Sequence, residues 1–473
     1  MVFSSLIFLF VFLPTFFAAY YIAPRGRRND IALIGSLFFY AWGAPRFVVA
    51  LILSSILDYA IGSLIFKNRA RPGVQKKLIA LSVVANISLL GYFKYANFFV
   101  SQANAALANL GFSPLPWVQV ALPVGISFFT FHKLSYSIDV FRGVVGPAKN
   151  FGAFLLYLAI FPQLIAGPII RYHVIERQLR DRSLSWDTVF EGIYRFCVGL
   201  GKKVLIADAL GAVADSIFDA KVDTLSSSKV WLGALTYSMQ IYFDFSGYSD
   251  MAIGLGAMMG FSFPENFNRP YRATDFTDFW RRWHITLSSW MREYVYIPMG
   301  GNRVPTWRRY LNLWIVFLLS GLWHGPNWTF VAWGLYHGFF LVADKVVLLR
   351  VSEHIFSPVR IASTFFLIMI GWVFFRADSL EHASSLLQVM FSFKSNPDPT
   401  AALARDLISN RGLTALTIAL LLSFCPTPTL KSRGVLALAS SPWVRGAFAL
   451  LLFFLSAANL TNSLFHPFIY FRF

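Results

Sequence analysis

The chain has 473 residues, of which 56% are hydrophobic and only 14% are charged. Soluble globular proteins carry about 25% charged residues, so this composition cannot cover a water-exposed surface and excludes an ordinary soluble domain. The net charge of +18 is better explained by Lys and Arg in cytoplasmic loops than by a nucleic-acid partner.

Apolar segments follow one another along the whole chain. A membrane span needs about 20 mostly apolar residues. The candidate spans are Phe3–Ile22, Ile31–Phe66, Leu78–Val100, Val120–Phe141, Phe151–Ile170, Phe190–Phe218, Val230–Phe261, Tyr310–Trp323, Trp328–Leu349, Val359–Phe375, Leu413–Phe424 and Trp443–Leu460. We therefore expect an all-α polytopic integral membrane protein. Residues 1–473 are expected to form a single membrane-embedded domain with about 11–12 membrane segments plus re-entrant helices.

The charges near the N-terminus predict its orientation. The apolar run that begins at Val2 has no basic region before it, and Arg25, Arg27 and Arg28 follow it. This order predicts an uncleaved first span with an extracytoplasmic N-terminus and the arginines inside the cell. The arginine-rich loop Arg171–Arg182 is also expected on the cytoplasmic side. In Ile31–Phe66, Pro45 predicts a tight hairpin, because proline removes a helix hydrogen bond.

The first polar stretch at membrane depth is Tyr242–Met251. Asp244 lies near the middle of the apolar run Val230–Phe261, and Ser246, Tyr248 and Asp250 surround it. Charged groups there are costly, so they mark candidate functional sites. Two interpretations remain open, a polar wall of an internal tunnel and a structural hydrogen-bond network between helices.

The second stretch is Thr277–Pro298, which is too polar to cross lipid alone. We expect a helix that lies at the interface or re-enters the protein. At 100° per residue one face carries Trp280, His284, Leu287 and Met291, and another carries Arg281, Arg282, Arg292 and Glu293. His284 on an apolar face is either a hydrogen-bonded core residue or a functional group.

The third stretch is Leu318–Trp328. His324 ends an apolar helix that begins near Arg309, and Gly325 and Pro326 break the helix directly after it. A rise of 1.5 Å per residue puts His324 about 22 Å from Arg309, which is within the hydrocarbon layer. A neutral imidazole there can take a proton from a hydroxyl, or it can bond a carbonyl that the break leaves open.

Motifs of other enzyme classes are missing from the sequence. No HExxH or cysteine-rich spacing predicts a metal site, so none is expected. No GxSxG elbow, P-loop or dinucleotide fingerprint follows a strand, which argues against a lipase-like serine nucleophile.

Several long strings together resemble the membrane-bound O-acyltransferase (MBOAT) family. They are FFYAWG at Phe38–Gly43, GYFKYANFF at Gly91–Phe99, LPVGISFFTF at Leu122–Phe131, FPQLIAGPI at Phe161–Ile169, YFDFSGYSDMAIG at Tyr242–Gly254, NFNRPY at Asn266–Tyr271, FWRRWHITLSSWMREYVYIPMGGNR at Phe279–Arg303 and SGLWHGPNWTFVAWGLYHG at Ser320–Gly338. Within the family the chain resembles the bacterial branch that contains the alginate O-acetylation membrane protein and the D-alanyl transfer protein of teichoic acids.

The resemblance implies a ring of transmembrane and re-entrant helices around a central tunnel. It implies that His324 matches the essential histidine of the family and that His284 matches the second signature position. The side chains implied to line the tunnel are Trp280, Arg281, Asp244, Ser246, Tyr248, Trp323 and Asn327.

The resemblance also implies an O-acyltransferase of the bacterial cytoplasmic (inner) membrane. The expected donor is a cytoplasmic thioester, acetyl-CoA or a carrier-bound acyl group, with no tightly bound cofactor. The acceptor is a cell-envelope or alginate-like exopolysaccharide, reached through an extracytoplasmic hydrolase-like acetyltransferase or a small carrier. Two alternatives remain open. A transporter or flippase would use the same polar residues as a permeation path, whereas a structural subunit of a polysaccharide export complex would tolerate apolar replacement of both His324 and His284.

Overall fold

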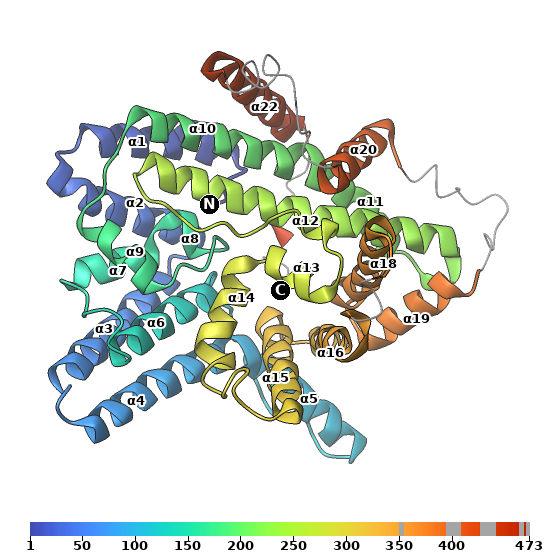
Figure 1. Ribbon diagram of the computed structural model, residues 1–473, viewed down its shortest axis with the longest axis horizontal. Coiled ribbons are helices and arrows are strands. Elements are labelled where there is room, and N and C mark those ends of the chain that lie inside the picture. Colours follow the sequence, from blue (N-terminus) through green and yellow to red (C-terminus); the bar gives the residue numbers. More distant parts are fainter. Residues whose placement is uncertain (350–353, 394–407, 426–440, 463–467, 470–473) are drawn as a thin grey trace. The chain divides into compact units, whose positions relative to one another are not determined.

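The computed structural model (Figure 1) describes residues 1–349, 354–393, 408–425, 441–462 and 468–469. These residues form helices joined by loops, and none of them lies in a strand. Five helical segments of this part of the chain are long and apolar enough to cross a membrane: Phe47–Lys67, Pro72–Asn109, Trp328–Leu348, Ser357–Arg376 and Pro442–Thr461. Phe8–Ile22 and Asn410–Phe424 are shorter apolar helices. The protein is therefore an all-α polytopic membrane protein, as the composition predicts.

The chain divides into two compact units, of which the first comprises Met1–Gly192 and Leu255–Pro264. The helices of the first unit are α1 (Leu13–Ile22), α2 (Arg28–Gly43), α3 (Phe47–Lys67), α4 (Pro72–Leu90), α5 (Ala96–Asn109), α6 (Ile126–Phe141), α7 (Phe151–Ala159), α8 (Phe161–Leu164) and α9 (Tyr172–Arg180). The predicted break at Pro45 is confirmed, since it lies between α2 and α3. The span expected over Phe151–Ile170 is interrupted after Ala159, because Pro162 has no N–H for the carbonyl four residues earlier.

A buried polar cluster joins α3, α4 and α6. Asp58 on α3 accepts hydrogen bonds from Ser82 at 2.7 Å and Asn86 at 2.8 Å, both on α4. The Lys133 ammonium on α6 lies 3.5 Å from the same carboxylate. On the α3–α6 contact, a Cβ at Gly62 would collide with the Tyr136 ring, so glycine permits the close approach of these helices. The pairing satisfies two buried charges that would otherwise be costly in an apolar interior.

The second unit comprises Ile193–Gly254 and Glu265–Phe473. Its described helices are the larger parts of α10 (Trp186–Gly201) and α12 (Ser227–Met258), followed by α11 (Asp208–Phe218), α13 (Phe276–Arg282), α14 (Ile285–Met291), α15 (Thr306–His324), α16 (Trp328–Ala343), α18 (Ser357–Arg376), α19 (Leu380–Phe391), α20 (Asn410–Phe424) and α22 (Pro442–Asn462). A π-helical stretch, Lys202–Ala207, joins α10 to α11.

Helices α15 and α16 form a hairpin with direct backbone contact. A Cβ on Gly321 of α15 would overlap the Phe330 carbonyl oxygen and lie 3.3 Å from the Gly334 Cα on α16. The predicted end of α15 is confirmed: the helix stops at His324, and Gly325 is extended at φ −167°. The Asn327 side chain then caps α16 by accepting a hydrogen bond from the Thr329 N–H at 3.1 Å. The hairpin thus fixes the position of His324.

Candidate active site

The segment around His284 consists of two short helices, so the prediction of one continuous helix is wrong. Helix α13 ends at Arg282, and His284 has left-handed backbone angles, φ 43° and ψ 54°, directly before α14. Backbone hydrogen bonds to the loop that contains Asn266 and Asn268 stabilise this break between the helices. Asn268 N–H donates to the Arg282 carbonyl, and Ile285 N–H donates to the Asn266 carbonyl, both at 2.9 Å. A left-handed non-glycine residue costs about 1–2 kcal/mol, so these bonds stabilise an otherwise unfavourable conformation.

The Asn266 side chain determines which nitrogen of His284 carries a proton. Its Oδ1 atom lies 3.3 Å from the Thr286 N–H, which can only donate, so the atom facing it is the amide oxygen. The same oxygen lies 3.0 Å from His284 Nδ1 and accepts from Thr286 Oγ1 at 2.9 Å. His284 Nδ1 must therefore be the donor, and Nε2 carries the lone pair of the neutral ring. The Asn266 amide nitrogen donates to Ser249 at 3.1 Å, which holds the amide in place.

His284 and His324 are both buried, and the ring of each lies near the Trp323 ring. The Trp323 ring centroid lies 4.9 Å from that of His324 and 6.1 Å from that of His284. Trp333 and Phe375 each approach the His324 ring edge-on at 5.0 Å. Three of the residues predicted for the site, His284, Trp323 and His324, therefore lie together in the structure. The rings around His324 are apolar, which strengthens electrostatic interactions with any group that reacts there.

Asp244 and Tyr248 of α12 take part in contacts with the C-terminal segment. The Asp244 carboxylate lies 2.8 Å from the Lys203 ammonium and accepts a hydrogen bond from the Ile469 N–H at 2.7 Å. Lys203 also pairs with Asp208 at 2.6 Å, and the Tyr248 ring stacks on Phe468 at 4.5 Å. For Asp244 these contacts fit the hydrogen-bond network, which was one of the two interpretations left open.

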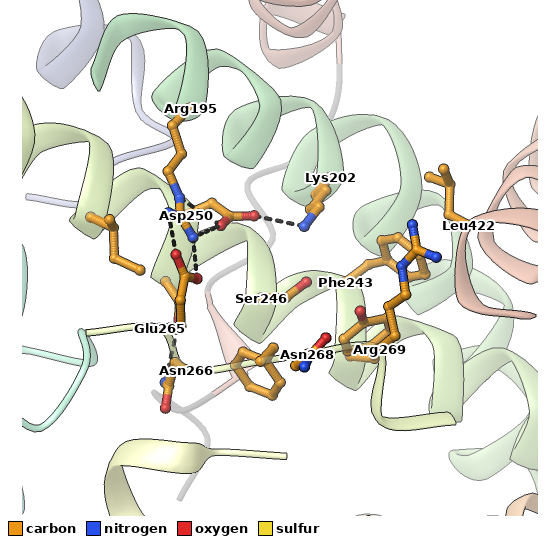
Figure 2. A pocket seen from close by; sticks show the side chains of 14 residues that line it. Arg195, Lys202, Phe243, Ser246, Asp250, Glu265, Asn266, Asn268, Arg269 and Leu422 are labelled. Atoms are coloured by element: carbon orange, nitrogen blue, oxygen red, sulfur yellow. Dashed lines mark hydrogen bonds and ion pairs between the residues drawn. The ribbon is translucent and has the colours of Figure 1, made fainter. Parts of the chain in front are cut away.

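Ser246 lines a polar cavity of about 320 Å³ in the second unit, shown in Figure 2. Asp250 forms ion pairs there with Arg195 at 2.9 Å and with Lys202 at 2.6 Å. Arg195 also forms an ion pair with Glu265. Other lining residues are Tyr242, Phe243, Ser249, Ile253, Asn266, Phe267, Asn268, Arg269 and Leu422. The amide that holds His284 is thus part of this wall. Sequence reasoning missed Asn266, although the NFNRPY string contains it.

Trp280 and Arg281 line a second cavity of about 250 Å³. Its walls come from α13 to α16, and the remaining lining residues are Thr277, Leu287, Ser288, Met291, Arg292, Tyr296, Asn302, Leu313, Val316, Phe317, Ser320, Leu341 and Lys345. The predicted separation of an apolar from a charged face is wrong, because Arg281 and Arg292 share this cavity with Leu287 and Met291. The break at His284 changes the direction of the chain between α13 and α14.

Asn327 lines a third cavity of about 320 Å³, at the end of α15. Phe330 and Phe375, which both contact the His324 ring, belong to its wall. The other lining residues are Tyr237, Pro326, Thr329, Arg376, Ala377, Asp378 and Ile469. Arg376 is paired there with Asp215 at 2.9 Å and Asp219 at 2.7 Å. In the described residues, no group of three or more His, Cys, Asp or Glu side chains could hold a metal ion.

Comparison with known proteins gives consistent matches. Residues 129–377 match the family model of the membrane-bound O-acyltransferases. The chain is 42% identical over 489 residues to a probable alginate O-acetylase of Pseudomonas putida, with 100% of both chains covered. It is 46% identical to a probable alginate O-acetylase of Pseudomonas aeruginosa, over 83% of this chain and 75% of that one. A peptidoglycan O-acetyltransferase of Helicobacter pylori is 37% identical, over 82% and 80% of the two chains.

Proposed function

Because the chain belongs to the membrane-bound O-acyltransferase family and is an O-acetyltransferase, we propose that it passes an acetyl group across the membrane through His324. The observation that carries the proposal is the position of two cavities along α15. The cavity with Trp280 includes Phe317 and Ser320, and the cavity with Asn327 includes Pro326, two residues after His324. Along this stretch of the chain, His324 therefore falls between lining residues of the first of these cavities and lining residues of the other.

The cavity with Trp280 suits the thioester end of the donor. From Leu313 to Ser320 it follows α15 for about 10 Å, and Ser320 precedes His324 by about 6 Å of helix rise. Leu287, Met291 and neighbouring apolar side chains fit an extended pantetheine arm, which is uncharged. Arg281, Arg292 and Lys345 supply cations for the phosphates of acetyl-CoA or of a carrier-bound phosphopantetheine. Lys202 and Lys203 are less suited to this role, because both are paired with carboxylates.

The reaction at His324 is a base-assisted acyl transfer. The imidazole takes the proton from the acceptor hydroxyl while the hydroxyl oxygen attacks the thioester carbonyl carbon. The C–S bond then breaks, and the leaving thiolate takes the proton from the imidazolium, which restores the neutral ring. General-base assistance of this kind contributes typically about 10²–10⁴-fold. Trp333 and Phe375, in contact with the ring, exclude water that would hydrolyse the thioester.

His284 acts in this scheme as an acceptor of protons or hydrogen bonds. Its Nδ1–H donates a hydrogen bond to Asn266 Oδ1 at 3.0 Å. In the neutral ring, Nε2 therefore carries a lone pair and no hydrogen. A ring in this state cannot donate to the thioester carbonyl. This tautomer favours a role for His284 in proton transfer over a role in positioning the thioester carbonyl.

The acceptor is proposed to be a hydroxyl of an alginate-like exopolysaccharide. The full-length match to a probable alginate O-acetylase supports this choice over peptidoglycan, for which the matching relative is less similar. Delivery to the polymer is proposed to require an extracytoplasmic hydrolase-like acetyltransferase or a small carrier. The donor would reach the protein from the cytoplasm in a bacterial inner membrane, with the N-terminus outside.

The proposal can be tested with purified protein in liposomes and acetyl-CoA labelled on the acetyl group. With a hydroxyl acceptor or the partner protein present, release of the CoA thiol should accompany transfer of the label. His324→Ala should lower this rate at least 10²-fold, whereas His382→Ala on α19, outside the three cavities, should leave it unchanged. Uptake of acetyl-CoA without release of thiol would instead identify a transporter and overturn the proposal.

A further inference from the structure

A strongly cationic cavity of about 410 Å³ lies in the first unit, apart from the residues of the proposed reaction. Arg25 lies in the turn between α1 and α2, and Arg28 is the first residue of α2. Arg180 is the last residue of α9, and Arg182 follows it by two residues. Asp181 is the acidic residue of the lining, which also includes Tyr20, Gly26, Asn29, Ser183, Leu184 and Met259. Four arginines facing one aspartate leave an excess of positive charge around the cavity.

Within the described residues, three of these arginines form no ion pair. Arg182 donates to neutral oxygens: the Met259 carbonyl at 3.0 Å, Asn29 Oδ1 at 2.7 Å and the Tyr20 hydroxyl at 2.8 Å. Arg28 lies over the Tyr20 ring at 5.7 Å, and its buried Nε has no hydrogen-bond partner in the described part of the chain. Arg25 is exposed and has no carboxylate within ion-pair distance there.

The fourth arginine differs from the others because Arg180 pairs with Glu176 at 2.5 Å. Arg182 is also held rigidly, since its hydrogen bonds connect α1, α2 and the segment around Met259. Its charge is thus preorganised toward the cavity, and Arg25 and Arg28 remain available to a ligand. An anion with several acceptor oxygens, such as a phosphate, fits this donor set.

Exposed apolar side chains lie close in the chain to residues that line the cavity. Trp186 is 81% exposed and Ile22 is 83% exposed, and both follow closely on lining residues in the chain. The Tyr21 ring lies 6.4 Å from that of Trp186. Aromatic side chains beside cations at the end of an apolar span are typical of a membrane–water interface. Basic pockets at this level bind anionic lipid headgroups.

We propose that this cavity binds the phosphate-bearing headgroup of an anionic phospholipid. The lipid chains would lie along the apolar side chains near Ile22 and Trp186, and the phosphate would lie between Arg25, Arg28 and Arg182. A soluble phosphate compound shares the same headgroup chemistry but gains nothing from the apolar rim.

The test compares two variants of the same turn. Arg25→Gln combined with Arg28→Gln removes two cations from the cavity. Arg27→Gln is the matched control, because Arg27 is 78% exposed, pairs with Asp30 at 3.4 Å and does not line the cavity. Phosphatidylglycerol and phosphatidylcholine are titrated into the detergent-purified full chain, and bound lipid is counted by native mass spectrometry. Size-exclusion chromatography and acetyl transfer verify that each variant is folded.

The double variant should bind phosphatidylglycerol about 30-fold more weakly, because each cation near a membrane surface is worth about 1 kcal/mol. The control should keep its affinity within about twofold. If the double variant does not fold, Arg25→Gln alone should weaken binding about fivefold. Equal wild-type affinity for both lipids, or an equal loss in the control, would overturn the proposal. So would displacement of phosphatidylglycerol by inorganic phosphate or glycerol 3-phosphate at matched concentration, since that result would identify a soluble anion as the ligand.

Discussion

Replacing Gly321 by alanine should inactivate the protein although no reacting group is touched. The new Cβ would overlap the Phe330 carbonyl oxygen and lie 3.2 Å from the carbonyl carbon. Both atoms belong to the backbone, so no side chain can move aside. The overlap is roughly 1 Å relative to van der Waals contact, and α15 must move away from α16 by about that distance. His324 lies three residues further along α15, so it moves with the helix.

A displacement of about 1 Å at a reacting group can lower a rate by about 10²-fold, equivalent to about 2.7 kcal/mol. Gly338→Ala is the matched control in the same hairpin. Its Cβ would lie 3.4 Å from the Trp314 ring and 3.5 Å from the Phe317 Cβ, which are ordinary contacts. The assay is thiol release from acetyl-CoA in liposomes at saturating donor, after size-exclusion chromatography of each variant. If folded Gly321→Ala works within about threefold of Gly338→Ala, the hairpin does not position His324 as argued.

Two further substitutions test the surroundings of the two histidines. Asn266→Ala should lower the thermal midpoint and kcat together, because it removes the Asn266 acceptor from the buried His284 Nδ1–H, at a cost of about 1–3 kcal/mol. Asn266→Asp still accepts that hydrogen bond and should restore part of kcat. Equal losses of kcat in the two variants would argue against a positioning role for Asn266. Arg281→Gln with Arg292→Gln should raise the KM for acetyl-CoA roughly tenfold and leave kcat nearly unchanged. The same KM change in Arg303→Gln, which is exposed outside the cavity, would show that general surface charge is responsible.

The position of His324 could be predicted from local sequence because the signals are local. Gly325 and Pro326 terminate the helix, and the preceding apolar run predicts its length. The structure ends α15 at the same residue. The contact between α15 and α16 could not be predicted. Gly321 and Gly334 allow the two backbones to approach closely, and the local sequence does not show that these helices pack together.

The position of His284 could not be predicted, because the forces that hold it come from a distant part of the chain. Periodicity alone favours one helix across residues 277–298. The structure places a left-handed residue in the middle, held by backbone hydrogen bonds to Asn266 and Asn268. Asp244 presents the same problem, since its partners Lys203 and Ile469 are far from it in sequence. The local sequence shows that a residue is polar, but it does not show which distant group will be its hydrogen-bond or ion-pair partner.

Breaks in helices distinguish the candidate reacting histidines from another buried one. In the described part of the second unit, His284, His324 and His337 are all buried. His337 lies within the regular helix α16 and packs against the rings of Trp333 at 4.8 Å and Trp280 at 5.1 Å. His284 and His324 instead lie where a helix begins or ends. Irregular backbone at membrane depth persists only where protein contacts or a cavity satisfy its polar groups. The contacts that satisfy the backbone at such a break also fix the orientation of the histidine there, and general acid–base catalysis requires a group that is held within hydrogen-bond reach of the substrate.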